Sequence, residues 1–175
     1  SMPKACPNYP LYVNDTSFLN GDVIANRQWI LDNVYANNQK KDTFAIAAAS
    51  DYFVKLIIKT KNGCVDSTTK KIIVNDYPTA ILGIRMTDSC YKNNSVRFLN
   101  GSKTSFGLLS GYKWLYSNGD TSIQQNPTRS FKDSGLYNVR LIAYTEGGCD
   151  DTSAAKPFRI YSAPYPTASV VDSAV

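Results

Sequence analysis

The feature that most constrains this chain is that its sequence repeats itself. Three residues of the first half return 85 positions later: Trp29 as Trp114, Tyr52 as Tyr137 and Cys64 as Cys149. Cys6 also returns, as Cys90, 84 positions later. A repeat of about 80 to 90 residues exceeds the period of solenoid proteins and is long enough for a domain with its own core. We therefore expect two domains, at residues 1–78 and 79–165, and at 166–175 the start of a following repeat or a tail.

The distribution of charged and apolar residues argues against nucleic acid as a partner and against membrane insertion. Charged residues make up 19% of the chain, and the net charge of +5 is spread evenly over both halves. Nucleic-acid binding needs clustered basic residues, and Lys40-Lys41 and Lys70-Lys71 are the only doublets. No apolar run approaches the ~20 residues of a membrane span. We therefore expect no nucleic-acid partner and no membrane insertion in this fragment.

The pattern of β-branched and aromatic runs predicts an all-β chain. Residues 52–60 and 65–74 are β-rich and are joined by Asn62-Gly63, a pair that favours a hairpin turn. The second half repeats this hairpin. Only residues 44–50 look helical, and they lack a cap and an amphipathic face, so we expect sheet or loop there. The fold class that follows is two tandem immunoglobulin-like β-sandwiches.

Each half carries two cysteines, one before its first matching strand and one after its hairpin turn. Four cysteines permit three pairings, and only Cys6–Cys64 with Cys90–Cys149 keeps each bond inside one repeat. We predict these two bonds, with four free thiols as the alternative. A zinc site is disfavoured because the chain has no His and no Cys-x-x-Cys motif. Disulfides indicate an oxidising compartment, so the predicted location is extracellular or on the cell surface.

The side chains available argue against catalysis and against a cofactor. The chain has no His and a single Glu, Glu146, so the usual general acids and bases are missing. Four aromatic residues lie in strand-like runs where immunoglobulin-like folds bury such side chains, and we assign them to the core: Trp29, Trp114, Tyr52 and Tyr137. Gly119-Asp120 indicates a turn. Asp120 is a candidate calcium ligand, but no alternating Asp/Asn run accompanies it, and we predict no metal site.

Three motifs of the second half stand in a fixed order: Tyr112-Lys113-Trp114-Leu115-Tyr116-Ser117-Asn118-Gly119-Asp120, then Asn126-Pro127, then Gly135-Leu136-Tyr137-Asn138-Val139. In order and spacing, residues 79–165 resemble the PKD (polycystic kidney disease) repeat, which implies PKD-type β-sandwiches. The first half has Asp32-Asn33 in place of the Gly-Asp turn. The Gly-Cys-x-Asp ending with an upstream cysteine resembles PKD-like domains of large surface proteins in gliding or predatory Bacteroidota. Such proteins are typically exported by the type IX system.

The junctions also repeat, because Tyr77-Pro78-Thr79-Ala80 recurs as Tyr165-Pro166-Thr167-Ala168. Proline there predicts a short, stiff linker and an array of repeats. The expected function is a non-catalytic spacer and adhesion module, with neighbouring PKD-like repeats, a surface polysaccharide or another cell-surface protein as partners.

Two alternatives to the spacer remain open. One is a polysaccharide-binding accessory module of a secreted hydrolase, and the other is homophilic assembly through exposed strands. A flat exposed row of tyrosines would favour the polysaccharide-binding module, and its candidate members are Tyr35, Tyr91, Tyr116 and Tyr161.

Overall fold

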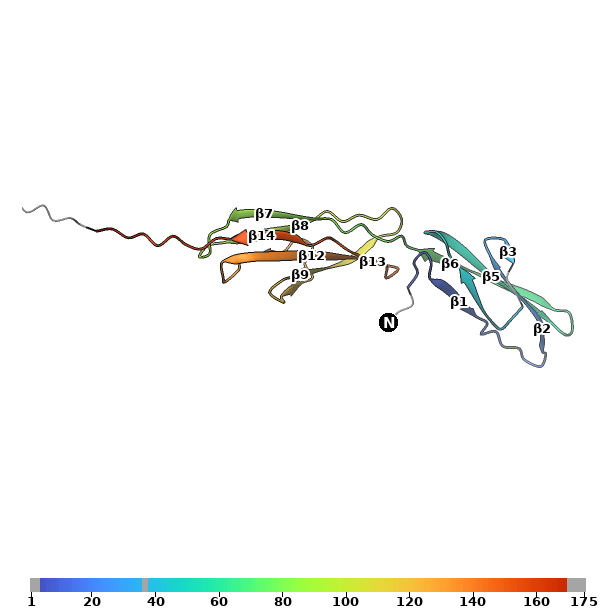
Figure 1. Cartoon of the computed structure of the whole chain (residues 1–175). Helices are drawn as coiled ribbons and strands as arrows, with labels where there is room; N and C mark the ends of the chain where they lie inside the picture. Colours follow the sequence, from blue (N-terminus) through green and yellow to red (C-terminus); the bar gives the residue numbers. More distant parts are fainter. Residues whose placement is uncertain (1–3, 36–37, 170–175) are drawn as a thin grey trace, which may run out of the picture. The chain divides into compact units, whose positions relative to one another are not determined.

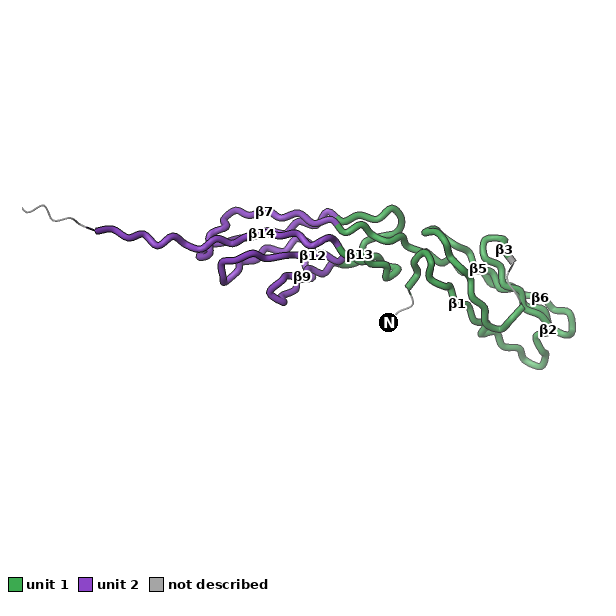
Figure 2. Tube along the Cα trace, in the orientation of Figure 1, with its two compact units in different colours: residues 1–80, 102–111, 143–152 green, residues 81–101, 112–142, 153–175 purple. Residues whose placement is uncertain are grey.

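The structure is a computed structural model that describes residues 4–35 and 38–169. Those residues form antiparallel β-strands and contain no helix, which confirms the predicted all-β class (Figure 1). Two compact units divide the chain (Figure 2). Unit 1 comprises Ser1–Ala80, Ser102–Gly111 and Ala143–Thr152, and unit 2 comprises Ile81–Gly101, Tyr112–Ile142 and Ser153–Val175. The domain boundaries expected from the sequence stay predictions.

Among the described residues of the first repeat (residues 1–78), six strands follow one another: β1 (Pro10–Asn14), β2 (Ile24–Leu31), β3 (Val34–Tyr35), β4 (Lys41–Ala45), β5 (Ser50–Thr60) and β6 (Val65–Val74). They form a two-stranded sheet, β1-β4, and a four-stranded sheet, β3-β2-β5-β6. Alternate residues of both sheets meet in one core, because successive side chains of a strand point to opposite faces. The buried members of this core are Trp29, Leu31, Phe44, Ile46, Val54, Leu56 and Val74.

The hairpin turns of the first repeat follow from their residues. Asp32 and Asn33 both have positive φ, 45° and 72°, between the paired residues Leu31 and Val34. Positive φ at both central positions is the type I′ geometry that twisted hairpins favour, so Asp32-Asn33 replaces the Gly-Asp turn of the second repeat. Gly63 also has the positive φ expected of its Asn-Gly turn. Residues 44–50 form no helix, because β4 ends at Ala45 and β5 begins at Ser50.

Eight strands follow in the second repeat: β7 (Leu82–Asp88), β8 (Ser95–Asn100), β9 (Leu109–Tyr116), β10 (Thr121–Ser122), β11 (Thr128–Arg129), β12 (Gly135–Thr145), β13 (Asp150–Thr152) and β14 (Lys156–Ile160). One sheet has the order β11-β8-β7. The other has the order β10-β9-β12-β13, with β14 also paired to β12. Its core is aromatic: the Phe98 ring meets Tyr116 and Phe158 edge-on, with centroids 5.0 and 5.6 Å apart. Such pairs stabilise a core beyond their buried area.

The aromatic residues singled out in the sequence occupy matching places. Trp29 and Trp114 lie in the two cores, and each indole N–H donates to a backbone carbonyl ten residues further on, at 3.1 and 2.9 Å. Tyr52 and Tyr137 are partly buried against the same cores. Each phenol donates to the carbonyl four residues upstream, at 2.9 and 3.0 Å. This contact has the form of the tyrosine corner of immunoglobulin-like sandwiches.

The two repeats differ at one sheet edge. β6 is a continuous outer strand whose first seven residues are exposed, including Lys70 and Lys71. In the second repeat, β12 is the counterpart of β5. It pairs at this edge with two shorter strands, β13 and β14, instead of one long strand.

A second difference concerns the smaller sheet. β7 pairs with β8, whereas no strand within residues 4–35 and 38–169 pairs with β1 except β4. The layer over β5 and β6 is therefore narrower in the first repeat.

Candidate functional site

The observed cysteine pairing corrects the prediction. One disulfide joins Cys6 to Cys149, whose Cα atoms are 5.7 Å apart, and Cys64 and Cys90 are free and exposed. The predicted Cys6–Cys64 and Cys90–Cys149 bonds are therefore wrong. The bond that forms links residues 143 positions apart in the sequence.

Strand length is the physical reason for the first error. The residue before Cys6 accepts a hydrogen bond from the N–H of Asn75, which directly follows the last residue of β6. Cys64 directly precedes the first residue of β6. A ten-residue strand spans about 33 Å, and a disulfide requires Cα atoms within ~7 Å. Cys6 and Cys64 thus lie at opposite ends of one strand and cannot bond.

The same reason applies to the second predicted bond. Cys90 forms a bridge with Tyr161, next to Ile160, which pairs with the first residue of β12. Cys149 lies in the turn after the last residue of β12. The eleven residues of β12 separate the two cysteines.

Unit 1 buries the disulfide completely. Cys6 and Cys149 are 1% and 0% exposed. The backbone beside Cys6 is held on two sides, because the Ala5 N–H donates to Gly147 and the Ala5 carbonyl accepts from Asn75, both at 2.9 Å. Burial and these main-chain bonds shield the disulfide from solvent reductants.

An ion pair lies beside the disulfide in the same unit. The Lys4 ammonium donates to the Asp150 carboxylate at 2.6 Å. This hydrogen bond raises the pKa of Lys4 above its ordinary value. Since both side chains are more than a third exposed, the pair adds little stability, as is typical of surface ion pairs.

Asn75 is packed so closely that two glycines face it. A Cβ at Gly147 would lie 2.6 Å from the Asn75 amide nitrogen and 2.7 Å from the Ala5 carbonyl. A Cβ at Gly107 would overlap the Asn75 amide oxygen. Only glycine fits at both positions, so this part of unit 1 depends on backbone-to-side-chain packing rather than on apolar side chains.

The first predicted linker is tied down by hydrogen bonds within unit 1. Asp76 N–H donates to the Phe106 carbonyl at 3.1 Å, and Thr79 exchanges backbone hydrogen bonds with Lys103 at 2.7 and 3.2 Å. Ala80 N–H donates to the Asp151 carboxylate at 2.8 Å. Two residues of the predicted linker lie in this segment, Tyr77 and Pro78, and the Tyr77 hydroxyl donates to the Pro7 carbonyl at 3.4 Å. In the second predicted linker, Tyr165 is 92% exposed and precedes Pro166.

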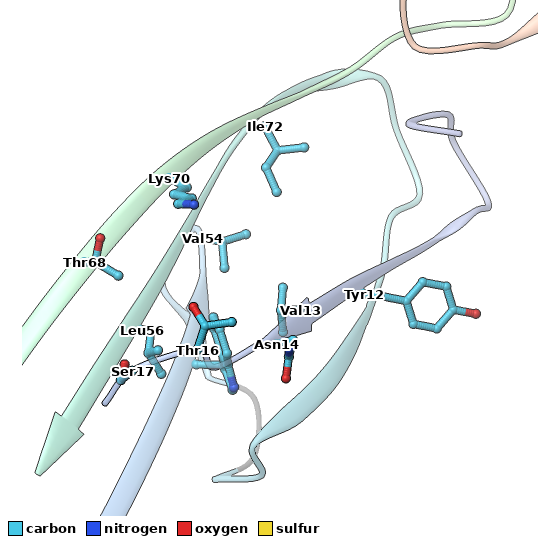
Figure 3. A pocket seen from close by; sticks show the side chains of 11 residues that line it. Tyr12, Val13, Asn14, Thr16, Ser17, Val54, Leu56, Thr68, Lys70 and Ile72 are labelled. Atoms are coloured by element: carbon cyan, nitrogen blue, oxygen red, sulfur yellow. The ribbon is translucent and has the colours of Figure 1, made fainter. Parts of the chain in front are cut away.

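A pocket of about 310 Å³ opens between the layers of unit 1 (Figure 3). Its floor is apolar and its rim is polar, with Asn14, Thr16, Ser17, Thr68 and Lys70 around Val13, Trp29, Val54, Leu56 and Ile72. Tyr12 lies at its margin, where the ring points away from the other labelled side chains (Figure 3). The pocket lies beside the β1 edge, where the smaller sheet is narrower than its counterpart. It offers apolar contact and hydroxyl groups, but no carboxylate.

The Gly119-Asp120 turn forms with Gly119 at a φ of 86°. One oxygen of the Asp120 carboxylate accepts from Arg129 at 2.9 Å and from the Asn118 amide at 2.9 Å. A guanidinium so close opposes a calcium ion at the same oxygen, since like charges repel. In the described ranges, no group of three or more potential His, Cys, Asp or Glu ligands is placed to hold a metal ion.

The tyrosines proposed for sugar stacking do not all form one exposed row. Tyr116 is buried in its core, beneath the Arg129 guanidinium at 4.7 Å from its ring centroid. Burial raises the pKa of the Tyr116 phenol to about 12, although the charge of Arg129 opposes the shift. Tyr91 and Tyr161 are exposed, and the Tyr91 N–H donates to the Tyr161 carbonyl at 2.8 Å. The side chain of Tyr35 lies outside the described residues.

Unit 1 contains a buried ion pair that no local pattern of the sequence predicts. Asp15 is 1% exposed, and its carboxylate accepts from the Arg27 Nε at 2.6 Å and from the Ser17 N–H at 2.7 Å. Burial raises the pKa of Asp15, but the hydrogen bonds from Ser17 and Arg27 outweigh it, so the pKa lies below the usual 3.8. Asp15 is therefore a structural anion paired inside the sandwich.

The described part of the chain has no helix long and apolar enough to cross a membrane. Comparison with known proteins places residues 75–160 on the model of the PKD domain, a non-catalytic type of module. The pre-pro-metalloprotease PrtV of Vibrio cholerae is 38% identical over 58 residues, which is 33% of this chain and 6% of PrtV. The chain thus aligns with a small part of that relative.

Two solved structures are also similar. The PKD1 domain of Vibrio anguillarum Epp is 25% identical, with a TM-score of 0.45, over 51% of this chain and 99% of that one. The fibronectin(III)-like modules of Clostridium thermocellum CbhA are 12% identical with a TM-score of 0.56, over 92% of this chain and 91% of theirs. The CbhA likeness shows the fold alone, a β-sandwich architecture. The family match is thus carried by residues 75–160, which fit the PKD domain model.

Proposed function

We propose that this chain is a non-catalytic spacer in a large secreted or cell-surface protein, where PKD-like repeats follow one another. The observation that carries the proposal is the Cys6–Cys149 disulfide, which closes a loop across 143 positions of sequence. A pulling force that enters before Cys6 and leaves after Cys149 passes through this bond. The residues inside the loop, which include most of both repeats, are then protected from extension.

The chemistry of the bond supports the proposed location. Disulfides persist in oxidising environments and are rare in the cytosol, where thiols are kept reduced. A buried bond between segments this far apart in sequence constrains the unfolded chain strongly, which suits a protein exposed outside the cell. The resemblance of the Gly-Cys-x-Asp motifs to surface proteins of Bacteroidota supports export by the type IX system.

The test is to replace the chain within its parent protein by two unrelated β-sandwich domains of equal total length. A spacer acts through its length and its resistance to extension, so the replacement should restore surface display and the activity of the flanking parts. A deletion without replacement serves as the matched control and should reduce both. If the replacement fails as completely as the deletion, this chain contributes specific contacts and the spacer proposal is wrong.

A second candidate is a polysaccharide-binding accessory module, supported by the exposed Tyr91 and Tyr161 on hydrogen-bonded backbones. Aromatic rings at the surface present flat apolar faces to which sugar rings bind. The test is retention of the chain on chitin and cellulose, with Tyr91→Ala and Tyr161→Ala as matched variants. Retention by the native chain that both variants lose would replace the spacer as the main function.

A further inference from the structure

The free Cys64 lies in a turn built like that of the bonded Cys149. In the first hairpin, the Thr60 N–H donates to the Cys64 carbonyl at 2.9 Å, and the Cys64 N–H donates to the Thr60 hydroxyl at 3.2 Å. In the second, Thr145 and Cys149 make the same two bonds, at 2.9 and 3.2 Å. The glycine before each cysteine has a positive φ, 90° and 77°. The two turns therefore hold their cysteines on equivalent backbones.

The free Cys90 is likewise held as Cys6 is held. The N–H of Asn75 donates to the carbonyl of the residue before Cys6 at 2.9 Å. The N–H of Tyr161 donates to the carbonyl of the residue before Cys90 at 2.8 Å. In both places, the cysteine lies beside the residue that follows the last strand of its repeat.

The bonded and the free cysteines differ in burial. Cys6 and Cys149 are covered, whereas Cys64 and Cys90 are exposed. The observed bond joins the leading cysteine of one repeat to the hairpin cysteine of the next. Cys90 is a second leading cysteine and Cys64 is a second hairpin cysteine, so each presents one half of this arrangement.

We propose that Cys90 forms a disulfide with the hairpin cysteine of a PKD-like repeat that follows, in the manner of Cys6 and Cys149. The inference rests on the proposed array of repeats and adds that a disulfide closes the junction after the second repeat. The repeat counterpart of Cys90 is Cys6, which is bonded to a hairpin cysteine in this structure.

Bond formation needs an oxidant, which we take to be a carrier with its own disulfide. One cysteine thiolate attacks the carrier disulfide and forms a mixed disulfide, releasing one carrier thiolate. The thiolate of the neighbouring repeat then attacks the mixed disulfide at the protein sulfur and releases the second carrier thiolate. Two protein thiols thus lose two protons and two electrons, and the carrier disulfide is reduced to two thiols.

The test adds a third repeat in register to the full chain. Because Tyr165-Pro166-Thr167-Ala168 repeats Tyr77-Pro78-Thr79-Ala80, a second copy of residues 81–175 is fused after Ala168. The segment from Tyr161 to Tyr165 is two residues longer than that from Asn75 to Tyr77, so the linker reaches at least as far. The chain is oxidised in a glutathione buffer, free thiols are alkylated, and linked peptides are mapped by mass spectrometry.

The side chain at Tyr161 requires a second variant. Tyr161 stands where Asn75 packs against Gly107 and Gly147, and its ring is larger. The three-repeat chain is therefore prepared also with Tyr161→Asn, which reproduces the observed junction. Cys64 forms no equivalent bond, because Asn62 stands at the position of Gly147, where a Cβ would lie 2.7 Å from the neighbouring carbonyl.

The expected result in at least one of the two chains is a bond from Cys90 to the added copy's counterpart of Cys149. Cys6–Cys149 forms as well, and Cys64, which has no preceding repeat in this chain, stays fully alkylated. With Cys90→Ser, the added hairpin cysteine becomes fully alkylated. The proposal is overturned if Cys90 is alkylated in both chains while Cys6–Cys149 forms, if Cys64 bonds Cys90 within the chain, or if Cys6–Cys149 does not form. None of these outcomes affects the domain-replacement test of the spacer.

Discussion

Removing the Cys6–Cys149 bond will lengthen the chain under force. In the oxidised protein, tension applied at the two termini passes from Cys6 directly to Cys149, so the loop between them cannot be extended. Cys6→Ser, or reduction, forces the same tension through every residue of the loop. The experiment is made in a Cys64→Ser/Cys90→Ser background, so that no other bond can form.

The magnitude follows from the size of the loop. An extended chain spans at most about 3.3–3.6 Å per residue, so the 143-residue separation adds about 500 Å to the fully unfolded length. The oxidised chain gains length chiefly from residues after Cys149, roughly 90 Å. In the chain-entropy model, the loss of a bond that closes this loop also lowers the free energy of unfolding by about 5 kcal/mol.

Single-molecule force spectroscopy with handles at both termini measures this difference directly. Oxidised molecules should rupture with a short length gain, and the same molecules after reduction should gain the additional length in one or two steps. Equal length gains before and after reduction, in protein whose Cys6–Cys149 bond has been verified by mass spectrometry, would refute the proposed force path.

Two further predictions concern unit 1. Asp15→Asn should lower the unfolding free energy at neutral pH by about 1–3 kcal/mol, because Arg27 then loses its charged partner. Since the folded pKa of Asp15 is depressed, its contribution is present above pH 4 and is lost as pH falls through the folded pKa. The unfolding free energy measured in urea should therefore decrease less in the variant than in the native protein as the pH falls below 4. An equal decrease in both proteins would contradict this. Gly107→Ala should cost about 2–4 kcal/mol, because it combines positive φ with overlap on Asn75. Gly119→Ala, with a similar φ and open space around it, should cost only about 1 kcal/mol. Similar thermal shifts for the two glycine variants would show that the Asn75 contact is unimportant.

Local signals in the sequence were sufficient for the hairpin of β5 and β6. The β-rich runs at residues 52–60 and 65–74 and the Asn62-Gly63 pair predicted it, because strand propensity and positive φ are properties of a few neighbouring residues. Even so, the Asn-Gly pairs of this chain are not equivalent. Gly21, Gly63 and Gly119 take positive φ, whereas Gly101 does not, and its N–H bonds to Ile81 as a continuation of the sheet edge.

The predicted disulfide pairing was wrong for a different reason. Repeat symmetry was used to confine each bond to one repeat, but symmetry only requires that equivalent cysteines have equivalent partners. A bond from each leading cysteine to the next hairpin satisfies this requirement equally well. The length of β6 would have excluded Cys6–Cys64, had the hairpin and the leading segment been placed at opposite ends of that strand.

The site contacts were the least accessible to sequence reasoning. No feature of the sequence marks Asn75 as a packing residue, or Gly107 and Gly147 as its neighbours. Asp15 and Arg27 were likewise two charges among 33 charged residues, the sum of 19 basic and 14 acidic ones. Such contacts depend on segments distant in sequence, so local patterns carry no information about them.

The exposed outer strand β6 has a consequence for synthesis. Neighbouring repeats of similar sequence risk exchanging strands while they fold, and a long edge with unpaired backbone groups is where such exchange begins. Lys70 and Lys71 lie on this edge, with Lys71 paired to Asp51 at 2.7 Å. The lysines of a second β6 placed alongside would repel Lys70 and Lys71, so the doublet disfavours edge-to-edge pairing of two copies of this strand. The Lys70-Lys71 doublet thereby favours separate folding of neighbouring repeats of one polypeptide.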